Sequence, residues 1–147
     1  MDTLKLENQL CFPLYACSKE VVKKYHPLLK KIDLTYTQYI TMMVLWKQKD
    51  MNVKSLGEKL YLDSGTLTPL LKKLEKKGYI KRTRNTKDER NLIISITNKG
   101  EELKKACENI PKQIGECIPL SKEESITLYQ LLYKLLLNVK KEGKKNV

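Results

Sequence analysis

Residues 52–97 constrain the fold more than any other stretch, because their pattern changes from helical to alternating within a short distance. Residues 53–60 form a short amphipathic segment, with Asn52 placed as its N-cap. Asp63 then caps a second segment, and Gly78 follows where a left-handed residue closes a helix. The leucines of this second segment recur at i, i+3, i+4 and i+7: Leu67, Leu70, Leu71 and Leu74. We therefore expect two short helices joined by a tight turn.

The sequence period changes after the second helix. Residues 79–84 and 91–96 are β-branched or alternate between apolar and polar side chains, and the six-residue link 85–90 is polar. Two helices followed by a basic hairpin predict a winged helix-turn-helix, in a mainly α-helical chain with a small β-hairpin wing. In this arrangement the second helix fits the DNA major groove and the hairpin tip fits an adjacent minor groove.

The outward face of this stretch is polar and basic. At the exposed start of the second helix, four residues lie where base edges and phosphates are in reach: Ser64, Gly65, Thr66 and Thr68. Basic residues farther along the helix and on the first strand would neutralise phosphates: Lys72, Lys73, Lys76, Lys81, Arg82 and Arg84. Binding through these residues is expected to be strongly salt-dependent.

The charge balance favours a polyanionic partner. The chain carries 29 basic and 17 acidic residues, a net charge of +12, and a cationic surface favours nucleic acid ahead of a membrane. The alternative is that the lysine content reflects the base composition of the genome. The clustering of charge on the proposed DNA face, as well as in the C-terminal tail, argues for DNA.

The 147 residues are expected to form a single domain. No apolar run approaches the roughly 18 residues needed to span a bilayer. The sequence begins Met-Asp without a charged segment and apolar core, so no secretory signal is expected. These features predict a cytoplasmic protein with reduced cysteines. Because no Cys-x-x-Cys pair occurs and His26 is the single histidine, neither a metal site nor a cofactor is expected.

Helical segments flank the winged element (about residues 35–97). Residues 4–30 are expected to be helical, with Pro13 either marking a start near Phe12 or kinking the helix. A capping-box pattern at residues 35–38 opens a helix to about Trp46. After the wing, Thr97 caps a helix that reaches Pro111, and a second capping box at residues 121–124 opens a last helix to about Val139.

The last helix is apolar on nearly every side, which one buried stripe does not require. A thick intramolecular core is one explanation. We favour a homodimer interface formed by the terminal helices of two chains, at about residues 4–30 and 98–140, because recognition of pseudo-palindromic DNA also needs a two-fold dimer.

The four cysteines lie at positions 11, 17, 107 and 117. For Cys17 and Cys107 we expect buried, inert thiols. Cys11 is different because Tyr15 follows one helical turn later, and Tyr25 and Tyr36 follow at larger offsets. Tyrosine hydroxyls aimed at a thiolate favour it over the thiol, and the thiolate is the form that attacks a peroxide. Sequence spacing alone leaves open whether these tyrosines converge on Cys11.

Several strings resemble the MarR-type repressors that sense organic hydroperoxides, and the similarity covers nearly the whole chain. The specific ones are Asn-Gln-Leu-Cys-Phe at residues 8–12 and Leu-Asp-Ser-Gly-Thr-Leu-Thr-Pro at residues 62–69, supported by residues 34–39 and 88–90. The resemblance implies an obligate helical dimer with Cys11 as the peroxidatic residue. It further implies that Tyr25 and Tyr36 contact this cysteine from the partner chain. Pro13 departs from the family pattern, which has a helix former there.

The resemblance implies two routes after oxidation. In one, the sensing cysteine pairs with a low-molecular-weight thiol. In the other, a resolving cysteine from the C-terminal region of the opposite subunit forms a disulfide, and we favour Cys117 for this role over Cys107. In the wing, the resemblance implies that Arg90 enters the minor groove and that Asp88 orients it. The alternative for Asp88 and Arg90 is a solvent-exposed ion pair.

Three other classes of function remain to be distinguished. A MarR-type repressor released by a small aromatic ligand would keep its response when Cys11 is replaced by serine. A thiol peroxidase would turn over peroxide without DNA affinity, and nothing else in the sequence resembles a catalytic constellation, so an enzyme is not expected. A nonspecific architectural DNA binder would show neither a preferred site nor a response to peroxide.

Overall fold

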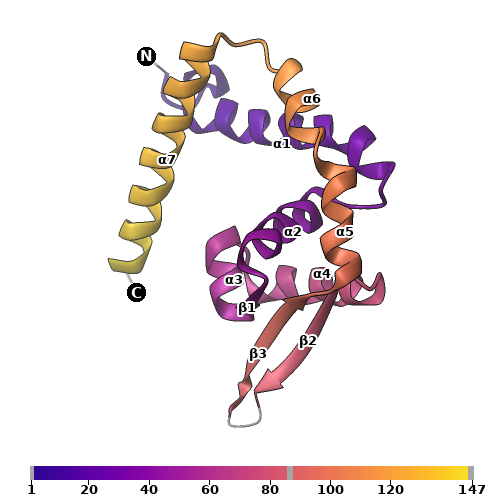
Figure 1. Ribbon diagram of the computed structural model, residues 1–147. Coiled ribbons are helices and arrows are strands. Elements are labelled where there is room, and N and C mark those ends of the chain that lie inside the picture. Colours follow the sequence, from indigo (N-terminus) through magenta and orange to yellow (C-terminus); the bar gives the residue numbers. More distant parts are fainter. Residues whose placement is uncertain (1, 86–87, 146–147) are drawn as a thin grey trace. The chain divides into compact units, whose positions relative to one another are not determined.

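The computed structural model describes residues 2–85 and 88–145, and the side chains of residues 2–84 and 91–140. The elements follow in chain order as η1 (Leu6–Asn8), α1 (Cys11–Lys30), α2 (Tyr36–Gln48), β1 (Asp50–Asn52), α3 (Val53–Leu60), α4 (Ser64–Lys76), β2 (Ile80–Asn85), β3 (Asp88–Ile96), α5 (Asn98–Cys107), α6 (Ile110–Glu116) and α7 (Lys122–Lys145) (Figure 1). The chain divides into two compact units, Met1–Ile114 and Gly115–Val147, which are treated separately below.

The wing belongs to a three-stranded antiparallel sheet with strand order β1-β3-β2. Ile80 pairs with Ile96 at the base of the hairpin, and Asn85 pairs with Asp88 near its tip. The predicted six-residue link is therefore wrong: both strands continue into it, and only residues 86–87, outside the described part, separate them. Strand β1 was not predicted, because a three-residue strand has no period of its own.

Side-chain caps start the helices of the winged element where the sequence predicted them. Thr35 and Gln38 form the capping box of α2. Asn52 accepts a hydrogen bond from the Lys54 backbone N–H at 2.7 Å, Asp63 from Thr66 at 2.8 Å, and Thr97 from Gly100 at 3.1 Å. These caps pair N–H groups that the first helical turn leaves unsatisfied. After α4, Gly78 has a φ of 84°, the left-handed conformation expected at this helix end.

The core of the first unit joins α2, α3, α4 and the sheet. Its fully buried side chains include Met42, Leu45, Leu56, Leu67, Leu71, Leu74, Ile80 and Ile94. Gly100 lets α5 approach closely, because a Cβ at this position would overlap the backbone oxygen of Tyr79. The Trp46 indole N–H donates to the Gly100 carbonyl oxygen at 2.9 Å and fixes α2 against α5.

The ends of two helices differ from the predictions, and the start of a third decides between two alternatives. Helix α1 begins at Cys11, which confirms the alternative of a start near Phe12 over a kink and leaves residues 4–10 outside the helix. Pro13 falls in the first turn, where the missing N–H costs no helical hydrogen bond. Helix α5 ends at Cys107, before Pro111, which instead occupies the first turn of α6. Helix α7 extends to Lys145.

The second unit is built around α7. Its N-terminus carries the predicted capping box: Ser121 Oγ accepts from the Glu124 backbone N–H at 3.1 Å, and Glu124 Oε1 accepts from the Ser121 N–H at 2.9 Å. The apolar side chains from Ile126 to Val139 are all substantially exposed in the single chain. Among the described residues, no helix is both long enough and apolar enough to cross a bilayer.

Candidate functional site

Helix α4 has the two faces expected of a recognition helix. Leu67, Leu70, Leu71 and Leu74 are buried beneath it, whereas the predicted base-reading residues Ser64, Gly65, Thr66 and Thr68 are exposed at its start. The hydrogen bond from the Thr66 backbone N–H holds the pKa of the Asp63 carboxyl below its ordinary value. The cap therefore remains ionised at neutral pH and keeps the first turn of the helix in place.

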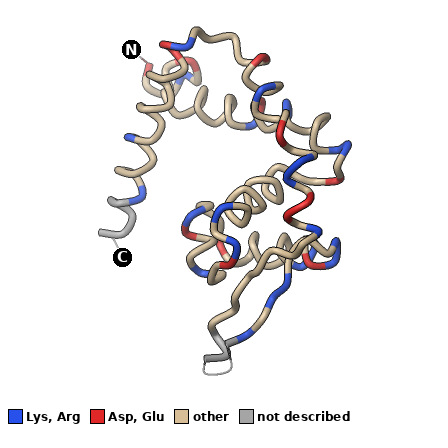
Figure 2. Tube along the Cα trace, in the orientation of Figure 1, with Lys and Arg blue, Asp and Glu red and all other residues tan. Residues whose placement is uncertain are grey.

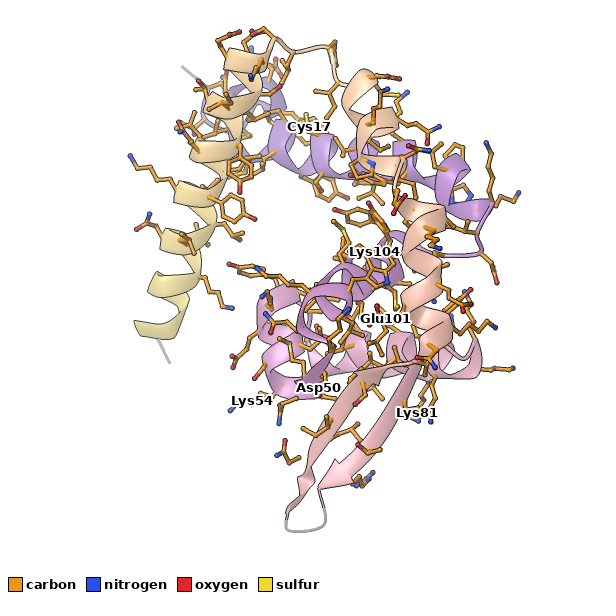
Figure 3. The ribbon with its side chains drawn as sticks, in the orientation of Figure 1. Cys17, Asp50, Lys54, Lys81, Glu101 and Lys104 are labelled. Carbon is orange, nitrogen blue, oxygen red and sulfur yellow. The ribbon has the colours of Figure 1, made fainter. Side chains whose placement is uncertain are left out.

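Basic side chains continue this surface onto the wing. Exposed cations lie along the second half of α4 and on β2: Lys72, Lys73, Lys76, Lys81 and Arg84. Figure 2 shows this basic character along β2 and near the carboxyl end of α4, and Figure 3 shows Lys81 on β2 and Lys54 at the start of α3. We define the exposed start of α4 and the five cations of α4 and β2 as the reading surface: Lys72, Lys73, Lys76, Lys81 and Arg84.

Arg82 has a structural partner. Its Nη2 and Nε atoms lie 2.9 and 3.1 Å from Glu75 Oε1, and its backbone N–H donates to Glu75 Oε2 at 3.2 Å. This pair joins β2 to α4, and the phosphate contact expected of Arg82 stays a prediction. The hydrogen bonds from Arg82 lower the pKa of the Glu75 carboxyl. The side chains of Asp88 and Arg90 lie outside the described residues, so their assignment stays a prediction.

Tyr25 and Tyr36, predicted for the thiol pocket, lie in contact. Their ring centroids are 4.8 Å apart, and Tyr39, which the sequence analysis missed, completes the group at 5.8 Å from Tyr25 and 6.4 Å from Tyr36. The spacing of Tyr36 and Tyr39, three residues apart on one helix, is the signal that could have found it. We call these three residues the tyrosine cluster.

Burial raises the pKa of all three hydroxyls, and that of Tyr39 reaches about 12. The tyrosine cluster therefore stays protonated at neutral pH and can donate hydrogen bonds. Tyr15 lies one turn after Cys11 in the continuous helix α1. Its ring contacts the Lys19 ammonium, which lies 5.2 Å from the ring centroid.

All four cysteines are free thiols. Cys11, the first residue of α1, is exposed, and so is Cys117, which follows α6 in the second unit. Cys107 is 3% exposed and its pKa is raised by burial, which confirms the expectation of a buried thiol. The same expectation is wrong for Cys17, whose side chain is exposed on α1 (Figure 3).

Comparison with known proteins gives one family. The family model of the SarA/Rot transcriptional regulators matches residues 23–107. The organic hydroperoxide resistance transcriptional regulator of Bacillus subtilis is 50% identical over 138 residues, which cover 92% of this chain and 92% of that protein. The transcriptional regulator SarZ of Staphylococcus saprophyticus is 51% identical over 127 residues, or 86% and 87% of the two chains.

Solved structures of a third regulator, AbfR of Staphylococcus epidermidis, share the fold. Reduced AbfR bound to DNA matches with a TM-score of 0.80 and 34% identity, over 95% of this chain and 96% of AbfR. The overoxidised, DNA-bound form matches with a TM-score of 0.74 and 35% identity, over 94% of this chain and 97% of AbfR. The disulfide form matches with a TM-score of 0.61 and 35% identity, over 97% of this chain and 95% of AbfR. The predicted winged helix-turn-helix fold is confirmed. The chain therefore belongs to the SarA/Rot family of winged-helix proteins and is a transcriptional regulator.

Proposed function

We propose that the protein is a homodimeric repressor that senses organic hydroperoxides by oxidation of Cys11 and then releases its operator DNA. The observation that carries this proposal is the position of Cys11, exposed at the start of α1 and outside the reading surface. Half of the aligned residues are identical to those of a regulator named for organic hydroperoxide resistance. As a DNA-binding regulator the protein would act in the cytoplasm.

The chemistry needs only the thiol and the peroxide. The Cys11 thiolate attacks one peroxide oxygen, so that an S–O bond forms, the O–O bond breaks and an alcohol leaves. The resulting sulfenic acid condenses with a second thiol to a disulfide and releases water. Because Cys11 begins α1, the partial positive charge of the helix start would stabilise an anionic sulfur. The protonated hydroxyls of Tyr25 and Tyr36 in the partner chain would donate hydrogen bonds to it.

We propose Cys117 of the opposite subunit as the resolving thiol. Its exposure favours it over Cys107, which is buried and keeps its proton. The disulfide form solved for AbfR supports disulfide formation as a product of oxidation in regulators of this kind. A mixed disulfide with a low-molecular-weight thiol is the alternative route.

DNA binding would use the reading surface of both subunits. The exposed start of α4 would enter the major groove, and the cations of α4 and β2 would contact phosphates on either side. In the dimer, the exposed leucines of α7 would be covered by the partner chain. Since two half-sites lie at a fixed helical separation, a disulfide that moves the subunits by a few ångströms would weaken both contacts together.

The test is fluorescence anisotropy with DNA from upstream of the protein's own gene, with and without an organic hydroperoxide. We expect wild type to lose affinity on oxidation and Cys11→Ser to keep it. Cys17→Ser is the matched control, because it removes another exposed thiol of the same helix and should respond like wild type. Tight binding by wild type whose Cys11 has been completely converted to a disulfide would refute the proposal.

A repressor released by a small aromatic ligand is the second candidate. It is favoured by a pocket of about 400 Å³ between α2 and α5, whose lining includes Tyr39, Met43, Trp46 and Cys107. Its aromatic and sulfur-containing walls suit a flat ring, and Lys47, Lys104 and Glu108, which also line it, could contact polar groups on that ring. A response to ligand that persists in Cys11→Ser, with no response to peroxide in wild type, would favour this function.

A further inference from the structure

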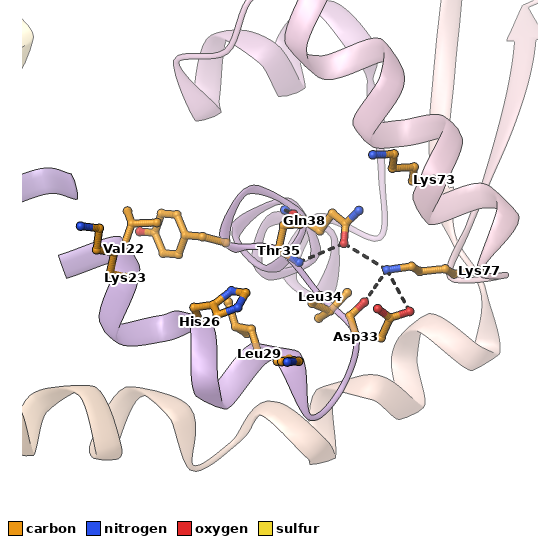
Figure 4. A pocket seen from close by; sticks show the side chains of 12 residues that line it. Val22, Lys23, His26, Leu29, Asp33, Leu34, Thr35, Gln38, Lys73 and Lys77 are labelled. Carbon is orange, nitrogen blue, oxygen red and sulfur yellow. Dashed lines mark hydrogen bonds and ion pairs between the residues drawn. The ribbon is translucent and has the colours of Figure 1, made fainter. Parts of the chain in front are cut away.

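Lys77, at the carboxyl end of α4, binds the turn between α1 and α2. Its ammonium donates a hydrogen bond to the backbone oxygen of Asp33 and another, 3.2 Å long, to Gln38 Oε1. The same nitrogen lies 3.5 Å from the Asp33 carboxylate. Figure 4 shows these three interactions converging on one lysine. The Lys77 side chain is 26% exposed and that of Asp33 is 93% exposed, so solvent screens the ion pair and the hydrogen bond to the buried Gln38 is the better shielded contact.

The acceptors of this contact are themselves held in place. Gln38 Oε1 also accepts from the Thr35 backbone N–H at 3.1 Å, as part of the capping box that starts α2. Gln38 is buried, and Asp33 adopts a φ of 54°, which fixes the turn. Lys77 therefore connects the recognition helix to a turn of defined geometry, and movement of the turn would be passed to α4.

The same turn is adjacent to the tyrosine cluster. Tyr36 is the first residue of α2 and lies two residues before Gln38, while its ring packs on Tyr25 of α1. A displacement of these rings would therefore move the first turn of α2, to which the Lys77 ammonium is bound. Residues of the thiol site and of the recognition helix are thus separated by one capping box and one lysine.

A pocket of about 560 Å³ lies between the second half of α1 and the end of α4. Its walls include Val22, Lys23, His26 and Lys30 from α1, and Lys73 and Lys77 from α4 (Figure 4). The space of this pocket lies among these side chains of α1 and α4. Lys77, Asp33 and Gln38 also line this pocket, so the Lys77 contact lies at its edge.

We propose that Lys77 is a positioning residue that couples the tyrosine cluster to the recognition helix. Through Gln38 and Asp33 it makes the α1–α2 turn and the end of α4 move together. A change at the thiol site then changes the orientation of α4 on DNA. This inference rests on the proposed redox function, and adds to it a connection between the tyrosine cluster and the recognition helix of the same chain.

The test compares operator affinity before and after oxidation in Lys77→Met, Lys77→Arg and wild type. The measured quantity is the dissociation constant of the oxidised protein divided by that of the reduced protein. We expect Lys77→Met to reduce this ratio about tenfold, mainly because the oxidised protein keeps binding. Lys77→Arg should restore most of the ratio. Lys23→Met is the matched control, since it removes a cation from the same pocket but not from this contact.

Two further readouts separate coupling from a structural role. Removing the ammonium leaves Gln38 Oε1 paired with Thr35, and the Asp33 side chain is 93% exposed, so the unfolding temperature should change little. The rate of Cys11 oxidation, followed by mass spectrometry, should equal that of wild type. An unchanged ratio in Lys77→Met would overturn the inference. So would equal losses of affinity in both oxidation states together with a lower unfolding temperature. A wild type that keeps its affinity after oxidation would instead overturn the proposed function, and this inference with it.

Discussion

The recognition helix α4 and the terminal helix α7 are both rich in leucine, but they bury it differently. The leucines of α4 are at most 6% exposed, whereas Leu131, Leu132, Leu135 and Leu136 of α7 are between 38% and 57% exposed. Helix α4 rests on a core that one chain completes by itself. The apolar surface of α7 is far more exposed, and such surfaces mark interfaces. The recognition helix is therefore supported by the core of one chain, whereas we expect the thiol site to need two chains.

The sharpest way to break this comparison is to place charge on α7. Leu132→Asp combined with Leu136→Asp changes two residues one turn apart and should convert the dimer to a monomer. Operator affinity should then fall by more than about 100-fold, because a single half-site lacks the second reader. Analytical ultracentrifugation measures the first effect and anisotropy the second.

Asn138→Asp is the control for the α7 variant, because it adds a charge at a position that is already polar. It should remain dimeric and bind DNA as wild type does. A double aspartate variant that stays dimeric with unchanged affinity would show that α7 does not form the interface.

A substitution in the core beneath α4 should lower the stability of each chain without separating the dimer. Leu71→Ala deletes a side chain that is 1% exposed and should lower the free energy of unfolding by about 3 kcal/mol. The loss should be independent of protein concentration, since the cavity lies within one chain. Urea unfolding at several concentrations measures it. Leu131→Ala on α7 should instead lower stability more strongly at low protein concentration.

The reading surface itself should respond to single charges. Lys72→Ala should weaken binding to any DNA by about three- to tenfold and reduce the salt slope by about one, because one phosphate contact is lost. Lys105→Ala, exposed on α5 outside the reading surface, serves as control. A change of sequence preference without a change of slope would place Lys72 at a base edge instead.

The smallest effect is expected at the Glu75–Arg82 pair. The folded pKa of Glu75 lies below its ordinary value of 4.5, so the pair stabilises the protein above that pH. Its contribution is lost as the pH falls through the lowered pKa. The midpoint temperatures of thermal unfolding of wild type and Glu75→Gln should therefore differ at pH 7 and become equal in acid. A difference that persists at the lowest pH would assign the effect to packing.

Local signals in the sequence were enough to predict much of the first unit. The caps at Thr35, Asn52, Asp63 and Thr97 depend on a few neighbouring residues, as does the leucine spacing of α4. Contacts between distant segments were missed because no local pattern encodes them. The pairing of β1 with β3 and the binding of Lys77 to Asp33 and Gln38 are of this kind.

In the candidate site, too, some residues could be predicted from the sequence, whereas contacts between distant segments could not. The resemblance identified Tyr25 and Tyr36, and the structure brings their rings together. Arg82 was assigned to phosphates because its charge is visible in the sequence, whereas its partner Glu75 is found only when α4 packs on β2. The exposure of Cys17 was missed because burial was expected from the usual state of a lone thiol, without knowledge of what packs against α1.

The central claim is that the oxidation state of Cys11 sets the affinity of the reading surface. The most direct measurement follows both quantities in one sample during titration with an organic hydroperoxide. Mass spectrometry gives the fraction of Cys11 joined to Cys117, and anisotropy gives the fraction of operator released. We predict that release rises in proportion to the disulfide and is reversed by a thiol reductant. Complete conversion of Cys11 to the disulfide with unchanged operator affinity would contradict this claim.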